Sequence, residues 1–406
     1  MTDSKHDVAI VGGGLAGGLI ALALHRHAPD VSFVLIEGGK TIGGNHRWSW
    51  FSSDLDAAGK ELLSSVHKTE WNDGYEVEFP RYKRVLNTDY QSMASSDFHD
   101  AISDLLPEGS VMLDTKAKGI EADGVELDDG TRITARAVVD CRSFRPSRHL
   151  RGAWQVFLGR HFKLDHDHGI ERPVIMDANV DQLAPHGNGG AYRFVYVLPL
   201  ADDEVFVEDT YYADDFKMDR EGLSARIDQY CHDNGWKDGA EIGVESGALP
   251  VLTGGNFKAY QEEVRIPGVA IAGARGGFTH PLTSYTMAIA VENALVIARN
   301  AHLPGKQLAE LMEQRARKYW RSTGYYRLLN RFLFFAADPE KRVNVLQRFY
   351  GLRQGLIERF YAAHSTTFDR VRVLWGNPPV AIHRAITAAF KRGEVMKKSA
   401  RTEKTV

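Results

Sequence analysis

The sequence predicts an α/β fold that begins with a parallel sheet, continues into a second, β-rich part and ends in a helical region. Two short apolar runs, residues 8–11 and 31–36, flank a small and apolar helical stretch, which is typical of a strand–helix–strand arrangement. Further strand-like runs lie between residues 154 and 212, and helical patterns dominate from residue 308 onward. The length of 406 residues favours two domains or one large interrupted domain.

The first turn of the chain carries a glycine pattern with a specific use. Gly12, Gly14 and Gly17 form G-x-G-x-x-G directly after the first strand. In this pattern the first glycine permits the turn, the second lets the backbone approach a pyrophosphate, and the third lets the helix pack against the strand. The phosphates lie at the helix N-terminus, here Leu15 and Ala16, where free N–H groups and the helix dipole favour negative charge. The pattern therefore predicts a dinucleotide site.

An acidic residue and a second glycine turn refine this site. Glu37 ends the second strand, 20 residues beyond the glycine pattern, and we expect its carboxylate to bind the two ribose hydroxyls. Residues 267–277 form an apolar strand that enters another glycine turn, with Gly273 and Gly277, before a helical stretch. The N-terminal place of the first motif and this second, flavin-type segment favour FAD over NAD.

The remaining strand patterns extend the prediction along the chain. Residues 111–113, 119–127 and 131–134 are expected to form a small antiparallel meander, followed by a separate buried strand at residues 135–140. The runs at residues 192–199 and 204–211 are expected to belong to a sheet that lies over a ligand.

These patterns predict three parts. We expect a discontinuous, Rossmann-type FAD-binding domain, a β-rich substrate domain and a helical, basic region. In that order they comprise residues 1–60 with 108–150 and 262–300, residues 61–107 with 151–261, and residues 301–406.

The formal net charge of −3 conceals a division between the body and the end of the chain. Residues 1–300 hold 29 basic and 45 acidic side chains, whereas residues 301–406 hold 21 basic and 8 acidic ones. This asymmetry indicates a nucleic acid, an anionic membrane surface, or docking of a basic helical piece on an acidic body. Residues 317–335 mix cations with aromatic and leucine side chains, as interfacial helices do, which disfavours nucleic acid. Docking on the body remains open.

Several other classes of protein and site are disfavoured. Two cysteines, Cys141 and Cys231, cannot form a disulfide framework or a cysteine metal cluster, and no histidine spacing typical of a metal site recurs. The polar start lacks the features of a secretory signal, and no apolar run reaches the roughly 18 to 20 residues of a membrane span. We therefore expect a cytoplasmic protein that is free to attach to a membrane surface.

Five segments give the chain a resemblance to the bacterial lycopene β-cyclases, in the family of flavin-dependent carotenoid cyclases. The segments read G-G-N-H-R-W-S-W-F, G-A-W-Q-V-F-L-G, R-P-V-I-M-D-A-N-V-D-Q, V-F-V-E-D-T-Y-Y and G-G-F-T-H-P-L-T-S-Y-T. They begin at residues 43, 152, 172, 205 and 276. Residues 348–362 are similar to the family's C-terminal segment. The resemblance covers most of the chain and implies an FAD-binding fold of the flavin hydroxylase and reductase kind.

The resemblance implies a reaction without net redox change. Each acyclic ψ-end of lycopene is protonated, the carbocation closes a ring, and proton loss leaves a β-ionone ring, giving γ- and then β-carotene. Lycopene and other acyclic carotenoids are the implied substrates, reduced FAD is the implied active cofactor, and NAD(P)H is its implied electron donor. The alternative is another FAD-dependent oxidoreductase of isoprenoids, such as a hydroxylase or a double-bond reductase, and a non-catalytic carrier is a third possibility.

Glu208 matches the family's acidic motif and is the expected general acid. Strand alternation puts it on the face of Phe206 and Thr210, opposite Asp209, which is then expected to face solvent or backbone. An apolar wall would raise the carboxyl pKa, because burial disfavours the charged form. The side chains expected to supply that wall are Phe206, Val207, Tyr211 and Tyr212. The base that removes the last proton is left open between the flavin, Glu208 and water.

The matching segments also imply cofactor contacts at Gly44, His46 and Thr283. His46 and His280 are otherwise expected to be structural hydrogen-bonding residues. A polyene tunnel or plain core is expected for the aromatic side chains of Trp48, Trp50, Trp154 and Tyr285.

Two departures from the family lie close to the expected flavin. The family usually has glycine where Ser284 stands and often proline where Met287 stands. If that glycine uses a positive φ, Ser284 must strain or reshape the turn.

The implied substrate offers an explanation for the basic character of the C-terminal region. Lycopene is a hydrocarbon that resides in the bilayer, so an enzyme without a membrane span must take it from the surface. Residues 301–406 are therefore expected to attach the protein peripherally to the anionic inner face of the cell membrane.

Overall fold

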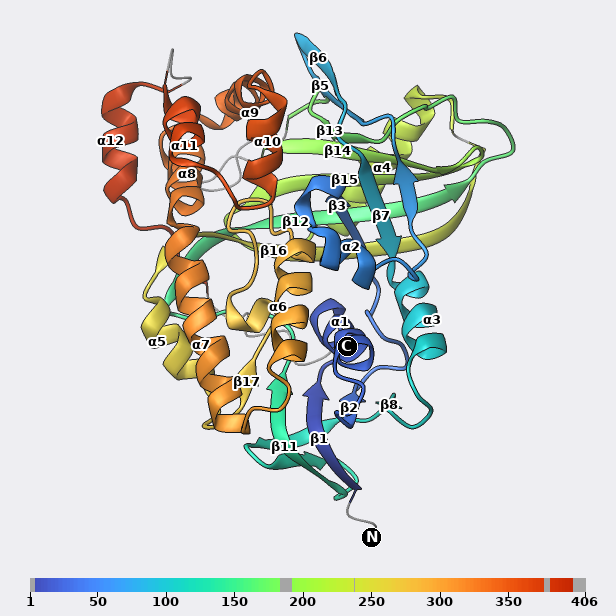
Figure 1. Ribbon diagram of the computed structural model, residues 1–406. Helices are drawn as coiled ribbons and strands as arrows, with labels where there is room; N and C mark the ends of the chain where they lie inside the picture. The colour runs from blue at the N-terminus through green and yellow to red at the C-terminus, as the bar shows by residue number, and fades with distance from the viewer. Residues whose placement is uncertain (1–3, 183–191, 237, 376–379, 397–406) are drawn as a thin grey trace.

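The computed structural model describes residues 4–182, 192–236, 238–375 and 380–396, which form three sheets with helices packed around them (Figure 1). The sheet of N-terminal strands lies at the bottom of Figure 1, a second seven-stranded sheet lies above it, and the last helices stand beside the upper sheet. Across these ranges, no helix has the length and apolar character that crossing a membrane requires.

The first sheet is built on parallel strands, in the order β8-β2-β1-β11-β10-β9, with β17 paired to β11. Within it β1 runs parallel to both β2 and β11, and β17 runs parallel to β11. The consecutive residues Ala9 and Ile10, which point to opposite faces, are both completely buried, as expected of strands covered on both faces. The strands are β1 (Ser4–Val11), β2 (Phe33–Ile36), β8 (Val111–Met112), β9 (Ala117–Glu121), β10 (Gly124–Leu127), β11 (Arg132–Asp140) and β17 (Ala270–Ile271).

The expected meander is correct only in part. Strands β9, β10 and β11 are antiparallel neighbours, but residues 111–112 pair in parallel with β2 at the far edge of the sheet. The expected strands at residues 131–134 and 135–140 are one strand, β11. Strand β11 pairs in parallel with β1 along nearly its whole length, and its first residues also pair antiparallel with β10 on the other side.

Helix α1 follows β1 and lies against α6 in the middle of the molecule (Figure 1). Nine of its thirteen residues are buried, because it is apolar on nearly every side and is covered by protein on nearly every side. Five helices accompany the first sheet and its neighbours: α1 (Leu15–His27), α2 (Ala57–Leu62), α3 (Ser95–Leu105), α5 (Phe257–Val264) and α6 (Met287–Arg299).

The second sheet has seven strands in the order β16-β12-β15-β14-β13-β5-β6. The expected strands at residues 192–199 and 204–211 are confirmed as β14 and β15, which pair antiparallel. Helix α4 (Arg220–Asp233) packs on β12 and β15. The strands are β5 (Tyr75–Phe79), β6 (Tyr82–Leu86), β12 (Leu150–Lys163), β13 (Val174–Asp177), β14 (Arg193–Ala201), β15 (Glu204–Ala213) and β16 (Ala240–Gly255). A third, small sheet contains β3 (Arg47–Phe51), β7 (Tyr90–Ala94) and β4 (Thr69–Trp71).

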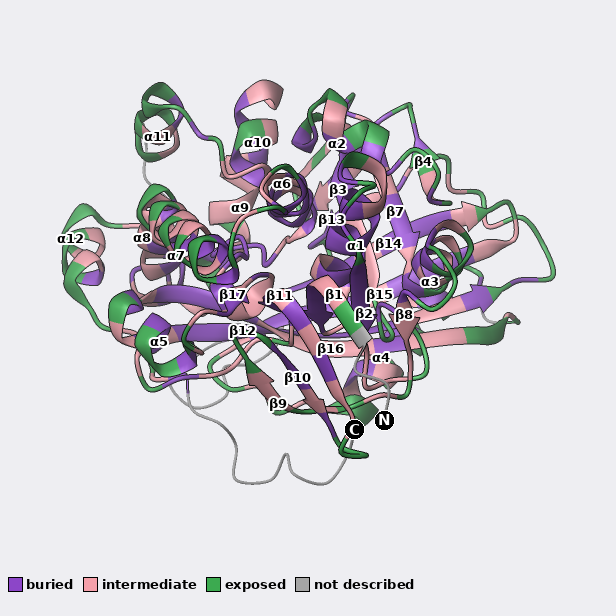
Figure 2. Cartoon of the chain, turned by 60° about the horizontal axis from the view of Figure 1, so that its bottom comes forward, coloured by how far each residue is buried: buried purple, intermediate pink, exposed green. Residues whose placement is uncertain are grey.

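The chain ends in the expected helical region. Its helices are α7 (Gly305–Ser322), α8 (Gly324–Phe335), α9 (Arg342–Tyr350), α10 (Gln354–Tyr361), α11 (Thr367–Leu374) and α12 (Ile382–Phe390). Figure 2 shows much of α11 and α12 exposed at the edge of the molecule, whereas β12, nearer its middle, is largely buried.

Three cations of residues 317–335 make contacts with the protein. Arg317 donates a 2.9 Å hydrogen bond to Gln261 in the body, although its side chain is 41% exposed. Arg327 is buried, and its guanidinium carbon lies 3.7 Å from the centre of the Trp320 ring. Arg331 donates to a backbone carbonyl near the end of α12. The expectation that this stretch offers its cations to a membrane is therefore wrong for the buried Arg327, and the contacts of Arg327 and Arg331 lie within the helical region itself.

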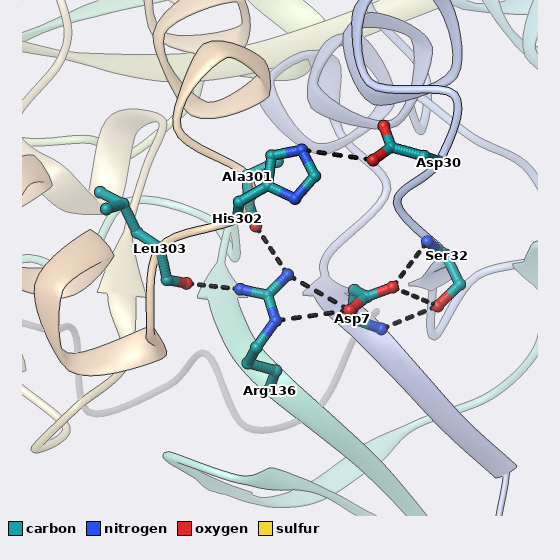
Figure 3. A network of polar contacts seen from close by, with 7 residues as sticks. All are labelled: Asp7, Asp30, Ser32, Arg136, Ala301, His302 and Leu303. Carbon is teal, nitrogen blue, oxygen red and sulfur yellow. Dashed lines mark hydrogen bonds and ion pairs between the residues drawn. The ribbon is translucent and has the colours of Figure 1, made fainter.

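A polar network fixes the start of this region to the first sheet (Figure 3). Arg136 of β11 donates to the carbonyl oxygens of Leu303 and Ala301 at 2.5 and 2.8 Å, and it pairs with Asp7 of β1 at 3.3 Å. Asp7 also accepts from the backbone N–H and the hydroxyl of Ser32, at 3.0 and 2.8 Å. The loop between α6 and α7 is thereby tied to two parallel strands.

Candidate active site

The glycine turn after β1 has the geometry that its sequence predicts. Gly12 has a φ of +103°, a region that favours glycine. A Cβ on Gly17 would lie 1.9 Å from the carbonyl oxygen of Gly12, so only glycine lets α1 approach the turn this closely. A Cβ on Gly14 would meet nothing within 4 Å, and Gly14 caps α1 without any side-chain hydrogen bond. The helix therefore presents free N–H groups to open space.

Glu37 lies at the end of β2 beside this turn. Its carboxylate accepts hydrogen bonds from the backbone N–H groups of Gly13 and Gly39, at 2.6 and 2.7 Å. These bonds hold the carboxylate at the cavity wall, where each oxygen retains a lone pair for a ribose hydroxyl.

A cavity of about 970 Å³ extends from the glycine turn to the second sheet. Most of the predicted site residues lie on its wall: Gly12, Gly14, Leu15, Ala16, Glu37, Gly44, His46, Glu208, Gly273 and Thr283. Two do not. Gly17 packs against the backbone of Gly12, and Gly277, with a φ of +82°, faces the ring of Phe257.

The first cavity fits a dinucleotide with a large ring system. Its volume lies at the upper end of the roughly 300–1,000 Å³ of small-molecule sites. One end holds the bare N-terminus of α1 and an acid for a ribose, and the other end is lined by aromatic and apolar side chains. Trp48, Trp154 and Tyr285 lie on this wall, whereas Trp50 is completely buried and does not. The donor set and shape therefore suit FAD, held by Gly12, Gly14 and Glu37.

Glu208 of β15 lies on the cavity wall with Phe206, as strand alternation predicts. The hydroxyl of Thr210, on the same face, donates to its carboxylate at 2.6 Å. Burial raises the pKa of Glu208 well above the ordinary carboxyl range, because the charged form loses water. The side chain is open only to the cavity, so its acidic form persists toward neutral pH.

The expected surroundings of Glu208 need two corrections. Val207 and Tyr211 lie on the opposite face of the sheet, in the core beneath α4, so they are not part of its apolar wall. Asp209 also faces that side, but it meets neither solvent nor backbone. It is completely buried and pairs with Arg193 at 2.8 Å and with Arg226 of α4 at 3.0 Å. Asp209 therefore anchors the helix to the sheet.

A second acidic residue, Glu245 of β16, lies on the same cavity wall and was not anticipated from the sequence. Glu245 is only 8% exposed, and burial raises its pKa, with the negative charge of Glu208 adding to the rise. Arg47 opposes this rise. The sequence gives little indication that Glu245 belongs to the site, because it lies 37 residues from Glu208 and the two meet only through strand pairing.

A second cavity of about 780 Å³ adjoins the first. Its wall is mainly aliphatic and aromatic, and it runs under α8 and α9 to the exposed side of α11 and α12. Gln155, Tyr196 and Thr283 line both cavities, which places the junction between them there. Tyr196 is the cross-strand neighbour of Glu208. The second cavity, called the apolar channel below, therefore leads from the surface to a wall that it shares with the cavity of the buried acid.

The histidines of the matching segments differ in their surroundings. His280 is buried, accepts from the backbone N–H groups of Leu282 and Thr283, and contacts the carbonyl of Phe360 at 3.1 Å. Burial lowers its pKa to about 3, so it is neutral and structural, as expected. His46 lies on the cavity wall, and burial lowers its pKa as well.

The two departures from the family have local explanations. Ser284 adopts a φ of +58°, and its buried hydroxyl donates to the carbonyl oxygen of Pro250 at 2.9 Å. It accepts the strained conformation that the family's glycine would take freely, and it gains a hydrogen bond. Met287 is the first residue of α6, a position where proline is also compatible with a helix.

Substitutions of Ser284 should separate these two effects. Ser284→Ala keeps the strained φ and loses the hydrogen bond, so the free energy of unfolding should fall by about 1–2 kcal/mol. Ser284→Gly loses the same bond but relieves strain of about 1–2 kcal/mol, so it should remain closer to the parent protein. Chemical denaturation measures the order, and an alanine variant more stable than the glycine variant would contradict this explanation.

Comparisons with known proteins agree with this geometry. The sequence pattern of the family described as lycopene cyclase protein matches residues 7–387. The chain is 38% identical over 384 residues to the lycopene beta-cyclase of Pseudescherichia vulneris, covering 95% of this chain and 97% of that protein. It is 37% identical over 383 residues to the lycopene beta-cyclase of Pantoea ananas, covering 94% and 97%.

Solved structures show the same fold at low identity. The p-nitrophenol 4-monooxygenase PnpA of Pseudomonas putida matches with a TM-score of 0.58 and 14% identity, over 89% of this chain and 99% of that one. A geranylgeranyl bacteriochlorophyll reductase-like protein of Thermoplasma acidophilum matches with a TM-score of 0.56 and 15% identity, over 95% and 96%. The predicted fold class is confirmed. Matched by the family pattern over nearly its whole length and more than a third identical to two of the family's enzymes, the chain belongs to the lycopene cyclase family.

Proposed function

We propose that the protein is a lycopene β-cyclase, which converts the acyclic ψ-ends of lycopene into β-ionone rings and so forms γ- and β-carotene. The observation that carries this proposal is the place of Glu208, a buried acid where an apolar channel meets a dinucleotide cavity. The family and the activity named for its relatives support it. Other acyclic carotenoids with the same end group are further candidate substrates.

Glu208 starts the reaction as the general acid. Its proton adds to the terminal double bond of the substrate, and the resulting carbocation is attacked by the next double bond, which closes the ring. The raised pKa of Glu208 keeps the proton available at a pH where an ordinary carboxyl would be ionised. The aromatic and aliphatic channel wall excludes water, which would otherwise trap the cation as an alcohol.

Gly12, Gly14 and Glu37 would hold FAD in the first cavity, with Gly44, His46, Gly273 and Thr283 farther along its wall. Bound in its reduced form, FAD would supply negative charge close to the developing cation. NAD(P)H is proposed as the electron donor, consumed substoichiometrically, because cyclisation moves no net electrons. The FAD-binding, substrate-binding and helical parts are proposed with the boundaries predicted from the sequence.

Expression in a lycopene-accumulating bacterial strain tests the activity directly. The expected result is conversion of lycopene to the bicyclic β-carotene, with γ-carotene as the monocyclic intermediate. Unchanged lycopene, or a hydroxylated or hydrogenated product, would contradict the proposal and favour another isoprenoid oxidoreductase. Such an enzyme would consume NAD(P)H in proportion to product.

The protein is further proposed to attach peripherally to the inner face of the cell membrane, at the mouth of the apolar channel. Seven of the nine large apolar side chains that are exposed among the described residues fall within residues 368–390. Trp375 is 73% exposed, Ile382 67% and Phe390 84%, and all three line the channel mouth. Exposed cations, Arg372 and Arg392, flank them. An apolar face with cations beside it suits an anionic bilayer that holds the hydrocarbon substrate.

Substituting Trp375, Ile382 and Phe390 together with serine should lower the fraction of protein that floats with anionic phosphatidylglycerol vesicles by at least about tenfold. Inserting one such side chain into lipid contributes about 1.5–3 kcal/mol. Serine at Val85 and Ile242, which are also exposed but lie elsewhere, provides the matched control and should leave flotation unchanged. Equal losses in both variants, or none in the first, would contradict this attachment. If this face instead joins two copies of the chain, the triple serine variant would lose its dimer, which would also contradict the attachment.

A further inference from the structure

Three adjacent strands bring Glu208 and Glu245 to one position. Strand β12 lies between β15 and β16, and Gly159 of β12 is the cross-strand partner of Glu208 on one side and of Glu245 on the other. Directly paired residues point to the same face of a sheet, so both carboxyl groups project into the first cavity, where both line the wall. Because the residue between them is glycine, β12 itself places no side chain between them, and the ring of Phe206 lies over Gly159 instead.

The two carboxyl groups are close enough to share a side-chain hydrogen bond. One of them must be protonated for that bond to form. The hydroxyl of Thr210 already donates to the Glu208 carboxyl group at 2.6 Å, so Glu208 is arranged to accept hydrogen bonds and Glu245 is the side chain left to donate.

The other charged and titratable groups near the pair do not take the place of Glu245 as a hydrogen-bond donor to Glu208. Arg47 of β3 lies beside Glu245, while Tyr90 of β7 and Tyr196 of β14 face Glu208. Asp209, on the opposite face of β15, adds negative charge that disfavours ionisation of Glu208. Neither tyrosine is ionised near neutral pH, because burial raises both pKa values further. Arg47 favours the charged form of Glu245, but burial outweighs it and the pKa of Glu245 stays raised.

We propose that Glu245 remains a neutral acid and donates a hydrogen bond to Glu208, which stabilises the Glu208 carboxylate as it forms. This proposal rests on the proposed cyclisation and deepens it. When Glu208 gives its proton to the substrate double bond, a C–H bond forms and the carboxylate is left between the hydroxyls of Glu245 and Thr210. After ring closure a C–H bond next to the cation breaks, its electron pair forms the ring double bond, and its proton returns to Glu208. Glu245 keeps its own proton throughout.

Glu245 is thus a positioning residue that makes Glu208 a stronger acid without exposing it to water. A preorganised donor aimed at developing negative charge typically contributes a factor of about 100 to 1,000 in kcat. Glutamine can still donate a hydrogen bond from its amide, whereas leucine cannot. Comparing these two variants therefore shows whether Glu245 acts as a hydrogen-bond donor or transfers a proton itself.

The test measures cyclisation of lycopene by the FAD-loaded full-length protein. Glu245→Gln should retain kcat within about tenfold, whereas Glu245→Leu should lower kcat by about 100-fold or more with little change in KM. The alkaline limb of the pH profile should move to higher pH in the leucine variant, because Glu208 loses a bond that favours its charged form. Glu241→Gln on the same strand, whose carboxylate pairs with Arg160 nearer the surface, is the control and should behave as the parent protein.

A measurement that needs no activity keeps this inference distinct from the proposed function. Infrared spectroscopy of the holoprotein carrying Glu208→Gln, in which position 208 contributes no carboxyl group, should show the carbonyl stretch of a protonated buried carboxyl at neutral pH. Adding Glu245→Gln to this variant should remove one such band, and an unchanged spectrum would overturn the proposal. So would normal kcat in Glu245→Leu, or a Glu245→Gln variant as inactive as Glu208→Gln, which would make Glu245 a proton-transfer group. If the parent protein forms no cyclic product, the function fails while the infrared result still decides the state of Glu245.

Discussion

Glu208→Gln is expected to form no detectable β-carotene from lycopene while it keeps its fold and its flavin. The amide is nearly isosteric with the acid but has no proton to give at this position, so the first step of cyclisation is lost. General acid catalysis typically contributes a factor of about 100 to 10,000. The measurement is the rate of product formation by the purified protein, with flavin absorbance as the check on cofactor binding.

The matched control is Glu204→Gln. Glu204 lies on the same strand but pairs with Lys163 near the surface, so its substitution should leave the rate unchanged.

The pH dependence of stability provides a second check. Glu208 has a raised pKa in the folded protein, so its contribution to stability is complete at low pH and is lost as the pH rises through that pKa. The glutamine variant should therefore lose less stability than the parent protein between mildly acidic and alkaline pH. Retained turnover would refute the role of Glu208.

Asp209→Asn should destabilise the protein and leave the chemistry intact, whereas the substitution of its neighbour Glu208 should abolish the chemistry and leave the fold intact. It removes the charge that compensates Arg193, which is itself 5% exposed, and weakens the pairing with Arg226. Removing one partner of a buried ion pair typically lowers the free energy of unfolding by about 3–5 kcal/mol. Thermal or chemical denaturation should show this loss, and any residual folded protein should still cyclise lycopene.

The control for Asp209 is Asp203→Asn, because Asp203 forms an exposed ion pair with Lys163 at 2.7 Å. An exposed pair of this kind contributes only about 0–1 kcal/mol, so the control should unfold almost as the parent does. If Asp209→Asn were as stable as Asp203→Asn, α4 would not be held to the sheet by this charge cluster.

Local sequence rules predicted the parts of the site that depend on neighbouring residues. The turn at Gly12, Gly14 and Gly17 is determined within one strand and one helix, and the structure has the close packing that the pattern predicts. Alternation along a single strand likewise placed Glu208 and Thr210 on one face and Asp209 on the other. Such features depend on local backbone geometry, which the sequence carries directly.

The features that were missed depend on pairing between distant segments. The partners of Asp209 come from β14 and α4, and Glu245 meets Glu208 only because β12 separates their strands by a single glycine. Residues 111–112 pair in parallel with β2, although they precede an antiparallel meander in the sequence. Composition also did not separate buried from exposed side chains in the helical region. Arg327 resembles an interfacial cation in the sequence but is buried against Trp320, and the exposed apolar side chains lie further along the chain.

The central claim is that protonation drives cyclisation without net redox change. The most direct measurement is the mass of the product formed in D2O, with the protein equilibrated in D2O, its FAD chemically reduced, and oxygen and NAD(P)H absent. The account predicts β-carotene that carries one deuterium for each ring, because the added proton comes from the exchangeable Glu208 carboxyl. A product with no deuterium in its rings, or one that has gained oxygen or a pair of hydrogens relative to lycopene, would contradict the account.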